Sequence, residues 1–259
     1  MSNIMWELHS DKILNLIKEG KRIDGRPLND YRKVSIQRNP FQNAEGSARV
    51  LLGETDVIVG VKFDIGEPYP DMQDEGTILV GAELLPLASP TFESGPPDEE
   101  SIELARVVDR GIRESKAIDF KKLCIKEGEH VFMVFVDLYA INYDGNLFDA
   151  CSIGALASLL DAKIPKQEDG KIIKGEYEGK LKLLRKPLLS TFAKIGTTMV
   201  LDPTLAEEKA MSARLSIATT EDDQISALQK GGSGSLTAQD ISNSIETAIS
   251  KTKELRKLI

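Results

Sequence analysis

The segment from Val131 to Leu160 constrains the fold of this chain more than any other. Val131–Ile141 is rich in β-branched and aromatic residues, and this composition predicts a long buried strand. Asp144 and Gly145 follow as a turn, and the Ala/Leu-rich run Ala150–Leu160 predicts a helix. The sequence therefore predicts a buried strand that turns directly into a helix, and the other elements are placed around this unit.

Shorter periodic segments on the N-terminal side predict one helix and several strands. Ser10–Glu19 has apolar residues at helical spacing, and Gly20 follows in the position of a C-cap. Segments 65–70 and 89–97 are rich in Gly, Pro and Ser and predict surface loops. Apolar runs bounded by polar turns predict strands at Val34–Ile36, Ala48–Leu52, Val57–Phe63 and Thr77–Leu85.

A charged, glycine-containing stretch from Lys163 to Lys186 predicts a boundary between two similarly built halves. We expect the first half, which includes the N-terminal helix, to span residues 1–162 and the second to span 163–259. A helix capped by Thr237 is predicted to run to about Leu258, after a flexible glycine-rich turn at 231–235. Strands in the second half are predicted at Leu188–Ile195, Thr198–Leu201 and Ala213–Thr219.

Composition argues against several classes of protein. No apolar run approaches the roughly 20 residues of a membrane span, and residues 1–7 lack the basic start and apolar core of a signal peptide. We therefore expect a cytoplasmic protein with no membrane contact. Cys124 and Cys151 have no metal-ligand spacing with each other or with His9 and His130. No metal site, disulfide framework or cofactor is expected.

Basic residues gather on one predicted helix, although the net charge of the chain is −8. This helix is predicted from Asp98 to about Ala117, with its apolar residues on one side. The arginines on the opposite stripe are Arg106, Arg110 and Arg113. From spacing alone, ion pairs such as Glu103 with Arg106, or Arg110 with Glu114, explain this stripe better than RNA binding does.

A series of short motifs resembles the RNase PH superfamily in order and spacing over most of the chain. The motifs are Arg22–Leu28, Tyr31-Arg32, Ala44–Ala48, Gly53–Ile58, Arg106–Arg113, Asp137–Ala155 and Leu201-Asp202-Pro203. The resemblance implies an α+β fold of the ribosomal protein S5 domain 2-like type, with two similar halves, each a sheet packed on helices. It also implies that arginines on the basic helix line the path of the RNA backbone, which favours RNA binding.

The turn after the buried strand departs from the pattern of the phosphorolytic members of this superfamily. They carry Gly-Gly-Thr-Arg, which matches Gly145, Asn146, Leu147 and Phe148 here. Phosphorolysis uses inorganic phosphate as the nucleophile, and a small dianion is held by backbone N–H groups and guanidinium donors. Leu147 and Phe148 offer neither a hydroxyl nor a guanidinium, and Asp149 adds a carboxylate that we expect to cap the helix. The resemblance therefore implies a degenerate phosphate site.

Asp202 matches the carboxylate that active members are proposed to use as general acid toward the leaving 3′-oxygen, and Glu208 lies where a second acid is common. An Asp-Pro turn in which Asp202 caps the local backbone explains the residue at least as well. An acid without bound phosphate performs no phosphorolysis under either interpretation. We therefore regard Asp202 as a vestigial acid and expect no catalytic residue.

Within the superfamily, the chain is most similar to the catalytically inactive RNase PH-like subunit of the exosome, in its archaeal form. The resemblance implies pairing with an active RNase PH-like subunit, closure of three such heterodimers into a hexameric ring, and entry of single-stranded RNA beneath RNA-binding cap subunits. The basic helix would then hold RNA over the partner's active site. Two alternatives stay open: an active phosphorolytic 3′-to-5′ exoribonuclease that uses Asp202, and a structural protein without RNA contact.

Overall fold

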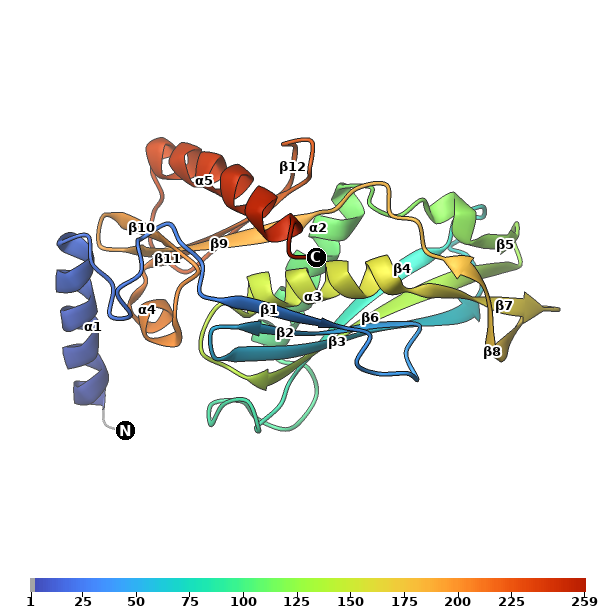
Figure 1. Cartoon of the computed structure of the whole chain (residues 1–259), viewed down its shortest axis with the longest axis horizontal. Coiled ribbons are helices and arrows are strands. Elements are labelled where there is room, and N and C mark those ends of the chain that lie inside the picture. The colour runs from blue at the N-terminus through green and yellow to red at the C-terminus, as the bar shows by residue number, and fades with distance from the viewer. Residues whose placement is uncertain (1–2) are drawn as a thin grey trace.

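A computed structural model describes residues 3–259, with side chains from Ser10 onward. Part of the N-terminal segment considered for a signal peptide, and the side chain of His9, therefore lie outside the described residues. Two sheets and five α-helices form the described chain, and a small two-stranded hairpin projects from one end (Figure 1). This is the α+β architecture that the resemblance implied.

The first sheet contains the long strand predicted from Val131. Strand β4 runs parallel to β6, and the other pairs are antiparallel. Gly53 and Glu54 form a two-residue turn between β2 and β3, and Gly53 has the positive φ of +60° that such a turn requires. The strands lie in the order β1 (Val34–Arg38), β2 (Gly46–Leu52), β3 (Thr55–Gly66), β6 (His130–Asn142) and β4 (Thr77–Leu84), with β5 (Cys124–Lys126) beside β6.

The helix that follows β6 is buried almost all round because it lies between both sheets. This helix, α3 (Leu147–Asp161), contacts β2 and β3 of the first sheet and β9 (Leu188–Ile195) of the second. A helix without a polar face is stable only when covered on every side. A Cβ built on Gly154 would lie 2.5 Å from Val59, so glycine allows this close approach between α3 and the first sheet.

The second sheet has the order β10 (Thr198–Leu201), β9, β11 (Ala213–Thr219) and β12 (Ile225–Gly231). The sequence predicted three of these strands and missed β12. Helix α5 (Ala238–Arg256) packs on β9 and β11, and Thr237 is its N-cap, as predicted. A short helix that was not predicted, α4 (Leu205–Ala210), is capped by Thr204.

The N-terminal helix packs on the second half of the chain. Helix α1 (Asn3–Lys18) is longer than the predicted Ser10–Glu19 and lies beside α4 (Figure 1). Its residues Ile13 and Ile17 are buried against Ala193, Ile195 and Val200. The predicted boundary between residues 162 and 163 remains a prediction. Helix α1, which belongs to the first half in that prediction, packs on elements of the second half.

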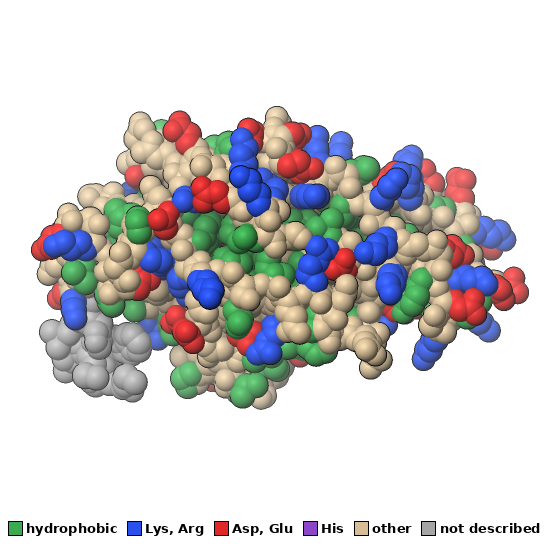
Figure 2. All heavy atoms as spheres, viewed as in Figure 1, with side chains coloured by type: hydrophobic (Ala, Val, Ile, Leu, Met, Phe, Trp, Pro, Cys, Tyr) green, Lys and Arg blue, Asp and Glu red, His purple; other side chains and the backbone are tan. Residues whose placement is uncertain are grey.

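The charged stretch after residue 162 forms the projecting hairpin. Strands β7 (Lys163–Glu168) and β8 (Lys171–Lys180) pair with each other, and a two-residue turn joins them at Asp169 and Gly170, which both have positive φ. On the face shown in Figure 2, acidic and basic side chains are interspersed, including over this hairpin at the right, so the negative net charge forms no single patch there.

The basic helix matches its prediction closely. Helix α2 (Glu99–Glu114) is capped by Asp98, whose side chain accepts from the Ser101 N–H. The 3₁₀ turn η1 (Phe120–Leu123) follows. No helix in the described part of the chain is long and apolar enough to cross a membrane. Within the same residues, no group of three or more His, Cys, Asp or Glu side chains is placed to hold a metal ion.

Candidate functional site

The turn between β6 and α3 is capped by Asn146, and the prediction that Asp149 caps this helix is wrong. Helix α3 begins at Leu147, three residues earlier than predicted. Asn146 has φ 56° and ψ 51°, a left-handed conformation that asparagine tolerates better than most residues. The Asn146 side chain accepts from the N–H of Asp149 at 3.3 Å, so Asp149 stands in the first turn of the helix.

Gly145 brings the backbone of this turn against the second half of the chain. Its φ is +89°, and a Cβ built on it would lie 2.4 Å from the backbone N of Leu205 and 2.6 Å from the carbonyl oxygen of Pro203. Any larger residue would force these two segments apart. The Thr55 hydroxyl donates to the Gly145 carbonyl at 2.6 Å and holds the turn from the sheet side.

Asp202 is fully buried at the centre of a set of cross-chain hydrogen bonds, here called the Asp202 cluster: Arg26, Arg32, Asn146 and Asp202. The Arg32 guanidinium binds both carboxylate oxygens, with Nε donating to Oδ2 at 2.9 Å and Nη2 donating to Oδ1 at 2.8 Å. The Arg32 backbone N–H donates to Oδ2 at 2.8 Å. Arg26 and the Asn146 amide add bonds of 2.9 and 2.8 Å. The local cap considered from sequence is wrong, because these partners lie at least 56 residues away.

A second buried pair continues this cluster. Arg22 donates to Glu207 with two bonds of 2.9 and 2.5 Å, and to the carbonyl oxygens of Leu201 and Asp202, both at 2.8 Å. The Glu207 carboxylate also accepts from the N–H of Thr204, which completes the capping box of α4. These bonds connect the segment before β1 to the loop after β10.

Asp149 places a second buried carboxylate at the positive end of the α3 dipole. Its Oδ2 accepts from the Tyr31 hydroxyl at 3.0 Å and from the Asn146 amide and the Thr191 N–H, each at 2.9 Å. Its Oδ1 has no hydrogen-bond partner among the described residues. Burial raises the pKa of Asp149 to about 6, and the negative charge of Asp202 adds to this rise, whereas the hydrogen bonds oppose it.

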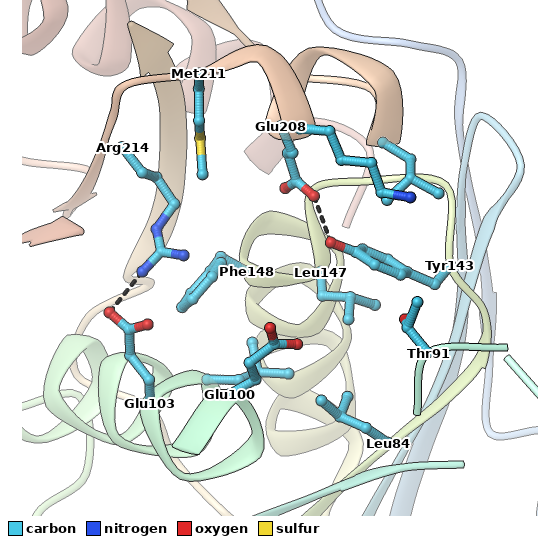
Figure 3. A pocket seen from close by; sticks show the side chains of 13 residues that line it. Leu84, Thr91, Glu100, Glu103, Tyr143, Leu147, Phe148, Glu208, Met211 and Arg214 are labelled. Carbon is cyan, nitrogen blue, oxygen red and sulfur yellow. Dashed lines mark hydrogen bonds and ion pairs between the residues drawn. The ribbon is translucent and has the colours of Figure 1, made fainter. Parts of the chain in front are cut away.

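Leu147 and Phe148 form part of the wall of a pocket of about 400 Å³ (Figure 3). The two side chains are almost completely buried. Arg214 from β11 lies over the Phe148 ring and pairs with Glu103 of α2. The charged residues that line this pocket are Glu100, Glu103, Glu208, Lys209 and Arg214. Three carboxylates therefore face two cations, a charge balance that repels a phosphate dianion.

Glu208 lies in the same pocket and is held by Tyr143 and the turn. The Tyr143 hydroxyl donates to one carboxylate oxygen at 2.5 Å, and the Asn146 N–H donates to the other at 2.8 Å. Burial raises the pKa of Glu208, and the two hydrogen bonds and the charges of Arg214 and Arg32 reduce this rise. The position that matches the second acid of the family is thus occupied by a carboxylate that shapes the turn.

The three arginines of α2 are all exposed, but the structure gives them different partners. Arg113 pairs with Asp109 at 3.0 Å, donates to the Ile78 carbonyl at 2.7 Å, and lies 5.7 Å from the Phe120 ring centroid. Arg110 donates to Gln229 of β12 at 3.3 Å. Arg106 makes no hydrogen bond or ion pair with any residue that the structure describes.

The two ion pairs given as examples for this helix from spacing, Glu103 with Arg106 and Arg110 with Glu114, do not form, although Arg113 pairs with Asp109. Glu103 turns away from Arg106 and pairs with Arg214 of β11, at 2.5 Å. Arg110 bonds to Gln229 instead of Glu114. Arg106 and Arg110 line a shallow surface depression with Ile102 and Gln229. Two of the three guanidinium groups are therefore available to an external anion, and Arg113 is largely committed to the fold.

Sequence reasoning missed the roles of several site residues. Arg22, Arg26 and Arg32 belong to motifs that carried the resemblance, yet nothing local indicated that they surround Asp202. Arg214 was also missed. Its position in the strand Ala213–Thr219, whose other residues are uncharged, was the available signal, because a charged residue in a buried strand requires a partner.

Two family models match the two sheets of this chain and define its class. The model of the 3′ exoribonuclease family, domain 1, known as RNase PH, matches residues 30–165, and that for domain 2 matches residues 187–251. The chain belongs to this family.

Within this family, the chain is similar to components of archaeal exosomes. The chain is 51% identical over 261 residues to the exosome complex component Rrp42 of Thermococcus gammatolerans, covering 99% of this chain and 95% of the relative. It is 52% identical over 256 residues to the protein of the same name from Methanothermobacter thermautotrophicus, covering 98% and 94%.

A chain of the Archaeoglobus fulgidus exosome with RNA bound to the active site matches with a TM-score of 0.92 and 44% identity, over 98% of this chain and 99% of that one. A chain of an archaeal exosome core matches with a TM-score of 0.88 and 42% identity, over 98% and 97%.

Proposed function

We propose that this chain is a non-catalytic subunit of an exosome of the archaeal type. It pairs with an active RNase PH-like subunit, and three such heterodimers form a hexameric ring beneath RNA-binding cap subunits. The ring degrades single-stranded RNA from 3′ to 5′ with phosphate, in the cytoplasm, and this subunit supports the partner's active site and helps to bind RNA. The similarity to proteins named as exosome components supports the assignment to this complex.

The environment of Leu147 and Phe148 is the main observation that supports a non-catalytic role. Their side chains are apolar and buried, and the neighbouring pocket has an excess of carboxylates. Two further buried carboxylates, Asp149 and Asp202, surround the start of α3, where a phosphate would otherwise gain from the helix dipole. A phosphate nucleophile has no cradle here, so no in-line attack on RNA can be organised.

The alternative of an active enzyme with Asp202 as general acid is opposed by the Asp202 cluster. A general acid must reach the leaving oxygen directly or through one water. The Asp202 carboxylate is fully buried and already accepts bonds from Arg26, Arg32 and Asn146. Its role is to join the two halves of the chain.

The RNA-binding role is proposed for the exposed face of α2. Arg106 and Arg110 are free to hold backbone phosphates, and such contacts position RNA without reading its sequence. Arg113 contributes less to binding in this proposal because it stabilises α2 against β4 and η1. The interpretation of the stripe as ion pairs alone therefore applies to Arg113 only.

Reconstitution tests this function. The purified chain should release no nucleoside diphosphates from labelled single-stranded RNA with phosphate. A mixture with an active RNase PH-like subunit should release them at a rate well above that of either component alone. The native mass of the mixture should match three heterodimers. Phosphorolysis by the isolated chain, retained in a preparation free of other nucleases, would refute the non-catalytic assignment. A mixture that neither assembles nor gains activity would refute the subunit assignment.

A further inference from the structure

The pocket beside Phe148 has an apolar interior and polar walls. Leu84, Leu104, Leu147, Phe148 and Met211 provide aliphatic and aromatic surface, and the pocket holds about 400 Å³. This volume exceeds that of a single amino-acid side chain and lies in the range of small-ligand sites. Pairing of Arg214 with Glu103 directs that guanidinium toward α2 and away from the opposite wall (Figure 3).

Besides the Glu103–Arg214 pair, the charged groups that line the pocket are Glu100, Glu208 and Lys209, so its lining carries one net negative charge. Figure 3 shows the side chains of Glu100, from the first turn of α2, and Glu208, from α4, pointing toward each other across the pocket. Glu100 is exposed at the mouth, and Glu208 is half-buried deeper inside. Burial raises the pKa of Tyr143, and the charges of Glu208 and Glu100 raise it further, whereas the charge of Arg214 opposes the rise.

We propose that this pocket binds an alkylammonium or alkylguanidinium group, the chemistry of a lysine or arginine side chain and of a polyamine. The aliphatic stem would lie on Leu147 and Met211, and the cationic head would lie between Glu100 and Glu208. A cation there offsets the one net negative charge by which the three carboxylates of the pocket exceed its two cations. The site is thus adapted to a ligand of opposite charge to phosphate, and this holds whether or not the chain assembles into an exosome.

Calorimetric titration of the full-length chain tests this site. The cationic probes are spermidine, N-acetyl-lysine amide and N-acetyl-arginine amide. N-acetyl-norleucine amide provides a similar stem without charge, and inorganic phosphate is the anion. We expect saturable binding of at least one cationic probe that weakens with added salt, and no binding of norleucine amide or phosphate. Preference for spermidine identifies a free polyamine as the ligand, and preference for an amino-acid amide identifies a partner's side chain.

Charge-removing variants locate the binding. Glu100→Gln should lower the affinity for the cationic probe by about fivefold or more, as expected when one of two facing carboxylates is lost. Glu208→Gln should do the same, with circular dichroism used to check the turn that Glu208 supports. The matched control Glu99→Gln removes a neighbouring charge outside the pocket and should leave affinity unchanged. Absence of saturable binding by all cationic probes, equal binding by norleucine amide, or unchanged affinity in Glu100→Gln overturns the proposal.

Discussion

The guanidinium of Arg214 lies over the ring of Phe148, with 4.0 Å between its central carbon and the ring centroid. Phosphorolytic members of the family carry an arginine where Phe148 stands. In this chain, Arg214 from strand β11 covers that position, and Glu103 neutralises its charge. The aromatic ring and the arginine above it form one packed unit, so changing either residue affects the other.

Restoring the family residues should therefore not restore activity. We expect the double variant Leu147→Thr with Phe148→Arg to be less stable than wild type by about 3 kcal/mol, because it replaces packed apolar side chains and brings two guanidinium groups together. Phosphate-dependent release of nucleoside diphosphates should stay at background. Phe148→Leu is the control, since it keeps the site apolar. Phosphorolysis by the double variant would show that the turn alone silences this subunit.

The arginines of α2 should separate into two groups. In the assembled complex, Arg106→Ala with Arg110→Ala should weaken RNA binding equally for all sequences and flatten the dependence of log K on log salt by about 0.7 for each phosphate that the variant no longer neutralises. Adding Arg113→Ala should chiefly lower the unfolding temperature. Fluorescence anisotropy with labelled RNA measures the affinity and its salt dependence, and thermal denaturation measures the unfolding temperature. The control is Lys12→Ala with Lys18→Ala on α1, which removes the same number of positive charges elsewhere. Wild-type affinity and slope in the double variant would assign these arginines no RNA contact.

Changing the buried Asp202 should affect stability and not chemistry. Asp202→Asn leaves the guanidinium groups of Arg26 and Arg32 without their carboxylate, so we expect a loss of about 3 kcal/mol in the free energy of unfolding. Turnover per assembled complex should be nearly unchanged, whereas removing the matching carboxylate of the active partner should abolish it. Urea denaturation and an RNA-degradation assay at saturating complex separate the two effects. A large loss of turnover with intact assembly would make Asp202 a catalytic group.

Asp149 should make stability depend on pH in the direction opposite to most carboxylates. Its pKa is about 6 in the folded chain and 3.8 in the unfolded reference, so the folded state holds the proton more tightly. The contribution is present below pH 4 and is lost as pH rises through 6, by about 3 kcal/mol in total.

The comparison with Asp149→Asn isolates this contribution, because other titrations cancel in the difference. Relative to the variant, wild type should gain stability as pH falls from 7 to 4. The exposed Asp11→Asn variant serves as a control for the loss of one carboxylate. A difference between wild type and Asp149→Asn that is constant with pH would show that Asp149 titrates normally.

Local patterns predicted elements well, because period and turn chemistry are properties of neighbouring residues. The buried strand β6, the capped helix α2 and the arginine stripe follow from composition and spacing alone. The start of α3 was placed three residues late, because an apolar Leu-Phe pair gives no helix signal and Asn146 caps from a left-handed conformation. The six-residue helix α4 and the strand β12, in which polar and apolar residues are mixed, carried too weak a local signal.

The environment of Asp202 was beyond local reasoning for a different reason. Arg32 and Asp202 are 170 positions apart, and no spacing rule relates them. Their pairing is a result of topology, since the segment before β1 returns beside the loop after β10. The sequence could identify Asp202 as a candidate acid, but only the fold reveals that its oxygens are already occupied.

The long reach of the Asp202 cluster also determines when this face can form during synthesis. The chain is made from the N-terminus, so Arg26, Arg32 and the 144–146 turn all exist before Asp202 and Leu205 are added. Until then, two arginines lack their carboxylate and Gly145 has no backbone to pack against. The first sheet can assemble early from its largely sequential strands, as domains do on the ribosome. Its turn acquires its final shape only after β10 and the start of α4 have been translated.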